Sequence, residues 1–207
     1  MTGIKQPMTK KRGRRPLADG PALDRERLIE VLIGMARAGG IASLNIRPVA
    51  QALGVSPRLI YHHVRDKEDM LALLTDEIVR QNMPDLSPVD WEARLRNIVA
   101  SVHLAYRDVP GSAAFILSRS ANRLEQPHAL KIREAIFGAL DQAGLPPARR
   151  GEILILFSVI VLGNVIVAES LPEDDVRLAM QRDQVEAAYR RSTDLLLAAI
   201  RMAVSEN

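Results

Sequence analysis

The chain has 207 residues, of which 47% are hydrophobic and 26% charged, a composition typical of a soluble globular protein with room for a sizeable core. It contains no cysteine, which excludes disulfides, thiol catalysis and zinc sites built on thiolates. The net charge of +3 is uneven: residues 1–83 carry +5 and residues 84–207 carry −2, so the front of the chain suits nucleic acid or an anionic membrane surface.

Residues 1–21 are predicted to form a basic flexible arm. Six Lys and Arg residues fall in this stretch among glycine and proline, and its few apolar residues show no periodicity. No apolar segment follows the first basic residues, so we expect no secretory signal peptide. Together with the absence of cysteine, this favours a cytoplasmic protein.

Residues 22–83 are predicted to form a small helical domain. Apolar residues recur at three- and four-residue steps in four segments, 23–39, 47–53, 57–64 and 67–82. Gly40 and Gly54 are expected to end the first two segments. Ser56 and Asp66 are expected to cap the last two at their N-termini.

Residues 84–207 are predicted to form a second, larger domain that is also helical. The prolines between 84 and 88 mark the boundary, and the helical periods that follow cover residues 91–107, 113–123, 127–143, 148–170 and 176–204. No segment has the alternation of a strand, so the fold class is all-α.

One stretch of the second domain, residues 153–167, is apolar on all sides. At 15 residues it is shorter than the roughly 20 that a membrane span needs, and Ser158 and Asn164 interrupt it. We therefore expect a central or interface helix of a soluble protein and no membrane partner.

The segment 45–67 predicts a helix-turn-helix. Ala50 is small where two helices must cross closely, and Gly54 permits a tight left-handed turn between them. The second helix then presents its N-terminal residues to the major groove, where Arg47 and Arg58 are expected to read guanine. Tyr61 and Lys67 are expected to contact phosphates.

The basic arm has a composition suited to the adjacent minor groove. With the helix-turn-helix it gives a predicted DNA-binding set of Arg12, Arg14, Arg15, Asn45, Arg47, Ser56, Pro57, Arg58, Tyr61, His62 and Lys67.

On these motifs, residues 24–83 resemble the DNA-binding domain of TetR-family transcriptional regulators. The resemblance rests on residues 39–44, 49–56, 60–64 and 67–71, and in pattern it is nearer the tetracycline-repressor type than an average member. It implies a homodimer formed by the last long helices, a palindromic double-stranded operator, and a small-molecule effector in the helical core. It also implies that Arg47 reads a base and that the regulator is a repressor.

The sequence departs from the tetracycline-repressor pattern in the expected pocket. Met83 and Ala113 stand where that type places its drug- and magnesium-binding histidines. The effector is therefore expected to be largely apolar, with no metal and no cofactor. Its predicted contacts are Met83, Leu86, Ile98, Val102, His103, Tyr106, Phe115, Phe157 and Asn164, although Asn164 fits a dimer interface equally well.

Other functions remain as alternatives. An activator or a ligand-independent regulator would have the same fold. A helical protein whose arm contacts membrane lipid is less favoured, because an amphipathic arm would be needed and this arm has almost no apolar residues. No phosphate-cradling glycine loop or acid–base constellation predicts an enzyme. Adjacent His62 and His63 point about 100° apart on a helix, which argues against a shared metal ion.

Overall fold

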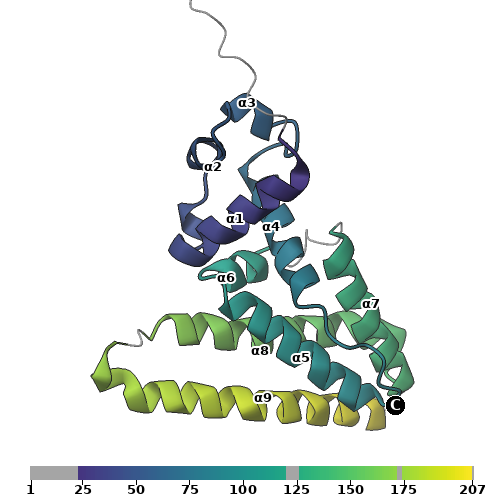
Figure 1. The fold of residues 1–207 in the computed structure, drawn as a ribbon. Coiled ribbons are helices and arrows are strands. Elements are labelled where there is room, and N and C mark those ends of the chain that lie inside the picture. Colours follow the sequence, from purple (N-terminus) through teal and green to yellow (C-terminus); the bar gives the residue numbers. More distant parts are fainter. Residues whose placement is uncertain (1–22, 120–125, 172–173, 207) are drawn as a thin grey trace, which may run out of the picture.

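A computed structural model describes residues 23–119, 126–171 and 174–206. The predicted arm, with Arg12, Arg14 and Arg15, lies outside these residues. Throughout the described ranges the regular elements are helices, with no strand, which confirms the all-α fold (Figure 1). The α-helices are α1 (Arg25–Gly39), α2 (Ile46–Leu53), α3 (Pro57–Ile60), α4 (Lys67–Gln81), α5 (Trp91–Arg107), α6 (Ser112–Leu117), α7 (Pro127–Gln142), α8 (Arg150–Glu169) and α9 (Ala179–Ser205).

Helices α1–α4 form a small domain around an aliphatic core. Fully buried Leu28, Leu32, Ile60, Met70 and Leu74 come from three different helices and lie in one cluster. The helical segment predicted over residues 67–82 is confirmed as α4. Leucine and methionine lose little side-chain entropy in a helix, so propensity and burial favour the same structure.

Carboxylate caps fix where two of these helices begin. The Asp24 carboxylate accepts a hydrogen bond from the backbone N–H of Arg27 at 2.6 Å, at the start of α1. The Asp66 carboxylate accepts one from the N–H of Asp69 at 2.8 Å, as predicted for α4. Each cap satisfies a donor that the first turn leaves without an intrahelical partner.

Helix α3 differs from its prediction in two respects. It ends at Ile60 rather than Val64, because the N–H groups of His62 and His63 bond three residues back and tighten the chain into turns. Ser56 occupies the N-cap position, but its side chain makes no capping hydrogen bond, so that predicted role was wrong.

Helix α6 is also shorter than predicted. It ends at Leu117 instead of reaching residue 123. The Ser118 hydroxyl donates to the carbonyl of Phe115, and the N–H of Arg119 bonds three residues back, to Ile116. Such local side-chain bonding competes with continuation of a helix.

Helices α5–α9 form the larger domain. In Figure 1, α8 and α9 run side by side along its base, α5 crosses them, and α7 stands next to the lower end of α4. The core joins Ile98, Ile136, Phe157 and Ile200 from four helices. Val79 of α4 belongs to this second core, whereas Leu74 belongs to the first, so α4 spans both domains.

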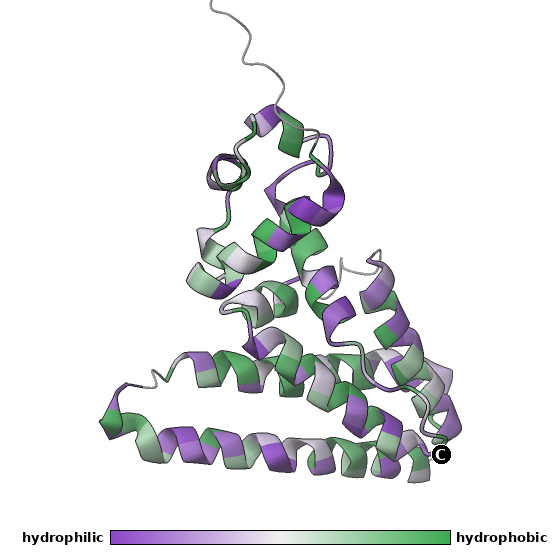
Figure 2. Ribbon diagram, in the orientation of Figure 1, coloured by the Kyte–Doolittle hydropathy of each residue, from purple (hydrophilic) through white to green (hydrophobic). Residues whose placement is uncertain are grey.

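Helix α8 is the most apolar of the helices. In Figure 2, green, the colour of hydrophobic residues, covers much of it. It is 20 residues long, so the length used to argue against a membrane span was wrong. By length and composition the segment Pro147–Glu169 could cross a membrane, with a mean hydropathy of 2.3 and 28% of its most apolar window buried. Core helices of soluble proteins meet the same criterion, and α8 packs against α5, α6, α7 and α9. Its outer face leaves Leu156, Val159 and Val167 exposed.

Candidate DNA interface and effector pocket

The turn between α2 and α3 has the geometry that the sequence predicts. Gly54 ends α2 with φ of 68° and ψ of 27°, a left-handed conformation that glycine adopts without strain. Its N–H and that of Val55 bond back to carbonyls of α2, and Ala50 is buried where the helices meet. The chain therefore reverses direction within three residues and carries α3 across α2.

The expected base- and phosphate-contacting side chains lie on or beside α2 and α3 and at the start of α4. Every predicted DNA contact within the described residues is exposed: Asn45, Arg47, Ser56, Pro57, Arg58, Tyr61, His62 and Lys67. The Lys67 ammonium donates to the Asn45 side-chain oxygen at 2.8 Å, which links the start of α2 to the start of α4. His63 instead turns inward, where its Nε2 donates to the carbonyl of Leu23 at 2.9 Å.

Two acidic residues near this surface are neutralised by arginines. The Arg119 guanidinium forms paired hydrogen bonds with Glu68 and lowers the pKa of that carboxyl group. Arg65 does the same for Asp69 through side-chain and backbone bonds. The exposed surface of α2 and α3 therefore presents Arg47 with Arg58 as positive charges available to a polyanion.

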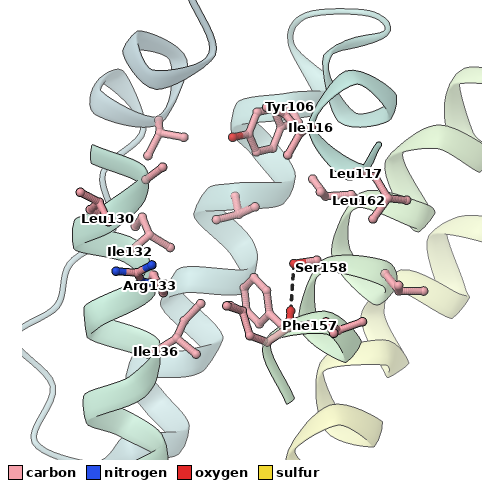
Figure 3. Close-up of a pocket in the computed structure, with 16 residues that line it drawn as sticks. Tyr106, Ile116, Leu117, Leu130, Ile132, Arg133, Ile136, Phe157, Ser158 and Leu162 are labelled. Atoms are coloured by element: carbon pink, nitrogen blue, oxygen red, sulfur yellow. Dashed lines mark hydrogen bonds between the residues drawn. The ribbon is translucent and has the colours of Figure 1, made fainter. Parts of the chain in front are cut away.

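A pocket of about 450 Å³ lies in the larger domain between α5, α6, α7 and α8 (Figure 3). Most of its lining is aliphatic or aromatic, from Val79, Val102, Ile116, Leu117, Ala129, Leu130, Ile132, Ile136, Leu154, Ile155, Phe157, Val159 and Leu162. Its polar lining residues are Tyr106, Ser158 and Arg133. A concave apolar site with few polar groups is typical of small-molecule binding.

The structure places three of the nine expected effector contacts in this lining: Val102, Tyr106 and Phe157. The other six lie outside it. Ile98 is fully buried in the core, whereas Met83, Leu86 and Phe115 pack against the clusters as partly buried side chains. The Asn164 amide donates to the carbonyl of Ile160 one turn back, at 2.6 Å.

His103, the remaining expected contact, stacks on α9 rather than facing the pocket. Its ring lies 3.6 Å from the Tyr189 ring at an interplanar angle of 16°. Burial lowers the pKa of His103 from its ordinary value, the positive charge of Arg107 lowers it further, and Glu186 acts in the opposite direction. The stacked pair thus fastens α5 to α9 with a neutral imidazole.

A pH dependence of stability follows from this burial. Since the folded state binds the His103 proton more weakly than the unfolded chain does, its contribution is present above the ordinary pKa of 6.5 and is lost as the pH falls below it. We expect the melting temperature to fall between pH 7.5 and 5, and to fall less in His103→Gln. His62→Gln, at an exposed position, is the control; equal pH dependence in both variants would contradict the assignment.

Helix α7 is joined to α4 through a buried carboxylate. Asp76 of α4 accepts hydrogen bonds from the backbone N–H groups of His128 and Ala129, both at 3.0 Å, and its second oxygen lies 2.8 Å from His128 Nδ1. One acidic side chain therefore caps α7 and fixes its start to α4.

The sequence analysis did not predict two of these features: the charge of Arg133 in the pocket lining, and the link that Asp76 makes between α4 and α7. Arg133 gave no distinct signal, because Lys131 and Glu134 beside it are also charged and nothing in the sequence singles out the residue that lines the pocket. Asp76 stood beside the buried stripe of α4, where an unpaired carboxylate would be costly and a partner should have been sought.

Further contacts connect the small domain to the loop before α6. The backbone N–H of Ile41 donates to the carbonyl of Pro110 at 2.9 Å, and Arg37 forms an ion pair with Asp108 at 3.0 Å. Gly40 has φ of 70°, and a Cβ there would lie 3.0 Å from the Pro110 oxygen. The close approach and the positive φ both require glycine at this position.

Sequence comparison supports the reading of the small domain. Residues 28–74 match the family described as bacterial regulatory proteins, tetR family. The chain is also 28% identical, over 155 residues, to the HTH-type transcriptional repressor DrrR1 of Streptomyces coeruleorubidus. That alignment covers 73% of this chain and 56% of the repressor, so the chain spans less than two thirds of that relative.

Solved structures share the fold over most of the chain. BioQ of Mycobacterium smegmatis has a TM-score of 0.74 at 20% identity, covering 87% of this chain and 99% of its own. A TetR variant of Acinetobacter baumannii AYE, solved in complex with minocycline, has a TM-score of 0.72 at 22% identity, covering 87% and 97%. A second BioQ structure contains its double-stranded DNA operator. The matching family and the similar repressor are transcriptional regulators, in agreement with the prediction of no enzymatic activity.

Proposed function

We propose, from the premise that this chain is a DNA-binding transcriptional regulator of the TetR family, that it is a cytoplasmic repressor released from its operator by a small, largely apolar effector. The observation that carries the proposal is the position of α4. Its N-terminal half is part of the helix-turn-helix core, and Val79 near its C-terminal end lines the pocket. A molecule that changes the pocket therefore acts directly on the helix that orients the DNA-binding domain.

The proposed release requires two conformations with different affinities for the effector. Asp76 and Val79 lie about one turn apart on α4, one bonded to α7 and the other facing the pocket. Separation of α7 from α4 by a bound molecule would tilt α4 and change the distance between the two recognition helices of a dimer. The minocycline complex of the TetR variant and the operator complex of BioQ support the same two kinds of ligand for this chain.

A homodimer is proposed through the outer faces of α8 and α9. Leu156 and Val167 are exposed along α8, and Leu195 with Met202 along α9. An exposed apolar surface on two adjacent long helices is typical of an interface between copies. Two recognition helices related by two-fold symmetry would then meet half-sites about 34 Å apart on a palindrome.

The DNA contacts are proposed to divide between bases and phosphates. Arg47 and Arg58 would read base edges in the major groove, and Tyr61 with Lys67 would fix the register on phosphates. The basic arm, through Arg12, Arg14 and Arg15, would enter the minor groove beside them, where a narrow groove attracts arginine.

Operator binding by Arg47 variants tests the proposal. In a gel shift with a palindromic fragment from upstream of the gene, Arg47→Ala should lose about 1–3 kcal/mol of binding free energy and relax base preference at one position of each half-site. Lys67→Ala is the matched comparison, because loss of a phosphate contact should weaken all sequences alike. Retained base preference in Arg47→Ala would remove Arg47 from the reading set, and failure of the wild type to prefer any duplex would refute the function.

A further inference from the structure

Among the described residues, the pocket lining contains one charged side chain that forms no ion pair. Arg133 of α7 is one of the lining residues, together with Phe157 and Ser158 of α8 (Figure 3). No Asp or Glu is among the residues that line the pocket. The Arg133 Nε is buried with no hydrogen-bond partner, and within the described residues its guanidinium forms no ion pair. A buried donor on a permanent charge is costly unless something pairs with it.

A second arginine beside the same ring shows how a neutralised guanidinium is held in this domain. The guanidinium carbons of Arg133 and Arg150 lie 6.0 and 5.9 Å from the centre of the Phe137 ring. The Nε of Arg150 also has no hydrogen-bond partner, but its terminal nitrogen forms an ion pair with Asp141 outside the pocket lining. Both side chains are partly buried, and they differ in that only Arg150 is paired with an acidic residue among the described residues.

The buried acidic side chain that joins α4 to α7 is already used. Both oxygens of Asp76 are held by α7, one by the N–H groups of His128 and Ala129 and the other by His128 Nδ1. The hydroxyl of Ser158 donates to the carbonyl of Leu154 at 2.9 Å. Neither group supplies the anion that Arg133 lacks.

We propose that the effector is an amphipathic carboxylate, whose acid group pairs with Arg133 while its apolar body fills the space between α5 and α8. The planar guanidinium matches a carboxylate by two parallel hydrogen bonds. A volume of about 450 Å³ accommodates a medium-chain or aryl acid. This inference rests on the proposed effector function and adds a charge to the otherwise apolar molecule predicted there.

The test compares an acid with a neutral molecule of the same length. Decanoate and decan-1-ol are titrated into the full chain at neutral pH by calorimetry. Decanoate should bind roughly 10- to 100-fold more tightly, as expected for a charge-assisted hydrogen bond. Arg133→Met should abolish that preference while leaving the affinity for decan-1-ol unchanged. Arg150→Met, which removes a paired guanidinium from the same ring, should keep the preference.

Stability of the variants provides an independent readout. Without ligand, Arg133→Met should melt at or above the wild-type temperature, because it removes an unpaired charge, whereas Arg150→Met should melt lower. Arg133→Gln serves as a second variant if Arg133→Met does not fold. Equal binding of acid and alcohol by the wild type, an unchanged preference in both Arg133 variants, or no binding of decanoate would overturn the inference.

Operator release separates this inference from the proposed function. If decanoate binds through Arg133 but leaves the operator complex intact, the carboxylate site stands and the effector-release function fails. If decan-1-ol alone releases the operator, the release function stands and the carboxylate site is refuted.

Discussion

Replacement of Leu195 by arginine is expected to convert the proposed dimer to a monomer and to lower operator affinity by roughly 10²- to 10⁴-fold. Leu195 is 67% exposed on α9, so the change leaves the core of one copy intact. In the proposed interface, however, it would place two unpaired charges against an apolar partner surface. Each monomer would then bind a half-site alone, without the second recognition helix at high effective concentration.

The measurement is molar mass by light scattering together with anisotropy on palindromic and single half-site duplexes. The variant should bind both duplexes equally, whereas the wild type should prefer the palindrome. Val89→Arg is the matched control, because Val89 is 81% exposed in the segment before α5 and gains the same positive charge outside helices α8 and α9. A Leu195→Arg protein that stays dimeric would place the interface elsewhere.

Local patterns predicted the small domain almost completely. The left-handed conformation of Gly54 and the cap of Asp66 depend on residues within one or two turns, and both are found as predicted. The Ser56 cap failed because short helix α3 tightens immediately after one turn, and whether the side chain reaches its N–H depends on the exact backbone path. The exposure of Arg47 and Arg58 follows from the same local period.

The pocket depends instead on contacts between distant helices. Three of the nine expected effector contacts lie in its lining, because the crossing of α5 over α7 and α8 decides which face of each helix meets the space. His103 illustrates the difference. It was predicted to contact the effector, but its ring partner is Tyr189 on α9, 86 positions further along the chain. The apolar periodicity of α5 or of α9 does not predict that these two rings stack on each other.

The same reasoning applies to α8. Its apolar composition and its extent, predicted as residues 148–170, were recognised, but its one-sided burial was not, because burial depends on where neighbouring helices cover it. A helix that is apolar on all sides but covered on only one side leaves apolar side chains exposed, which is typical of a surface that packs against a partner. The central position predicted for this helix agrees with its contacts to α5, α6, α7 and α9, and its role in an interface stays a prediction.

The link between α4 and α7 carries the second large prediction. Asp76→Ala is expected to lower the free energy of unfolding by about 3 kcal/mol, since it removes a buried carboxylate from three hydrogen bonds and leaves their donors without a partner. Asp90→Ala is the matched control. Asp90 caps α5 through the N–H of Ala93 at 2.8 Å, but it does not touch the small domain, and its loss should cost about 1 kcal/mol.

Urea unfolding measures the loss of stability, and amide hydrogen exchange locates it: the His128 and Ala129 amides should lose protection in Asp76→Ala and keep it in Asp90→Ala.

The second consequence of the substitution concerns DNA binding. If Asp76 holds α4 at one angle to the effector domain, its removal should let the small domains adapt to operators whose half-sites are one base pair too close or too far apart. Wild type and Asp90→Ala should discriminate strongly against both. Unchanged discrimination in a destabilised Asp76→Ala protein would mean that the carboxylate stabilises α7 without setting the spacing of the recognition helices. The pocket would then have to be coupled to the DNA-binding surface through the contacts of Ile41 and Arg37 with the loop before α6.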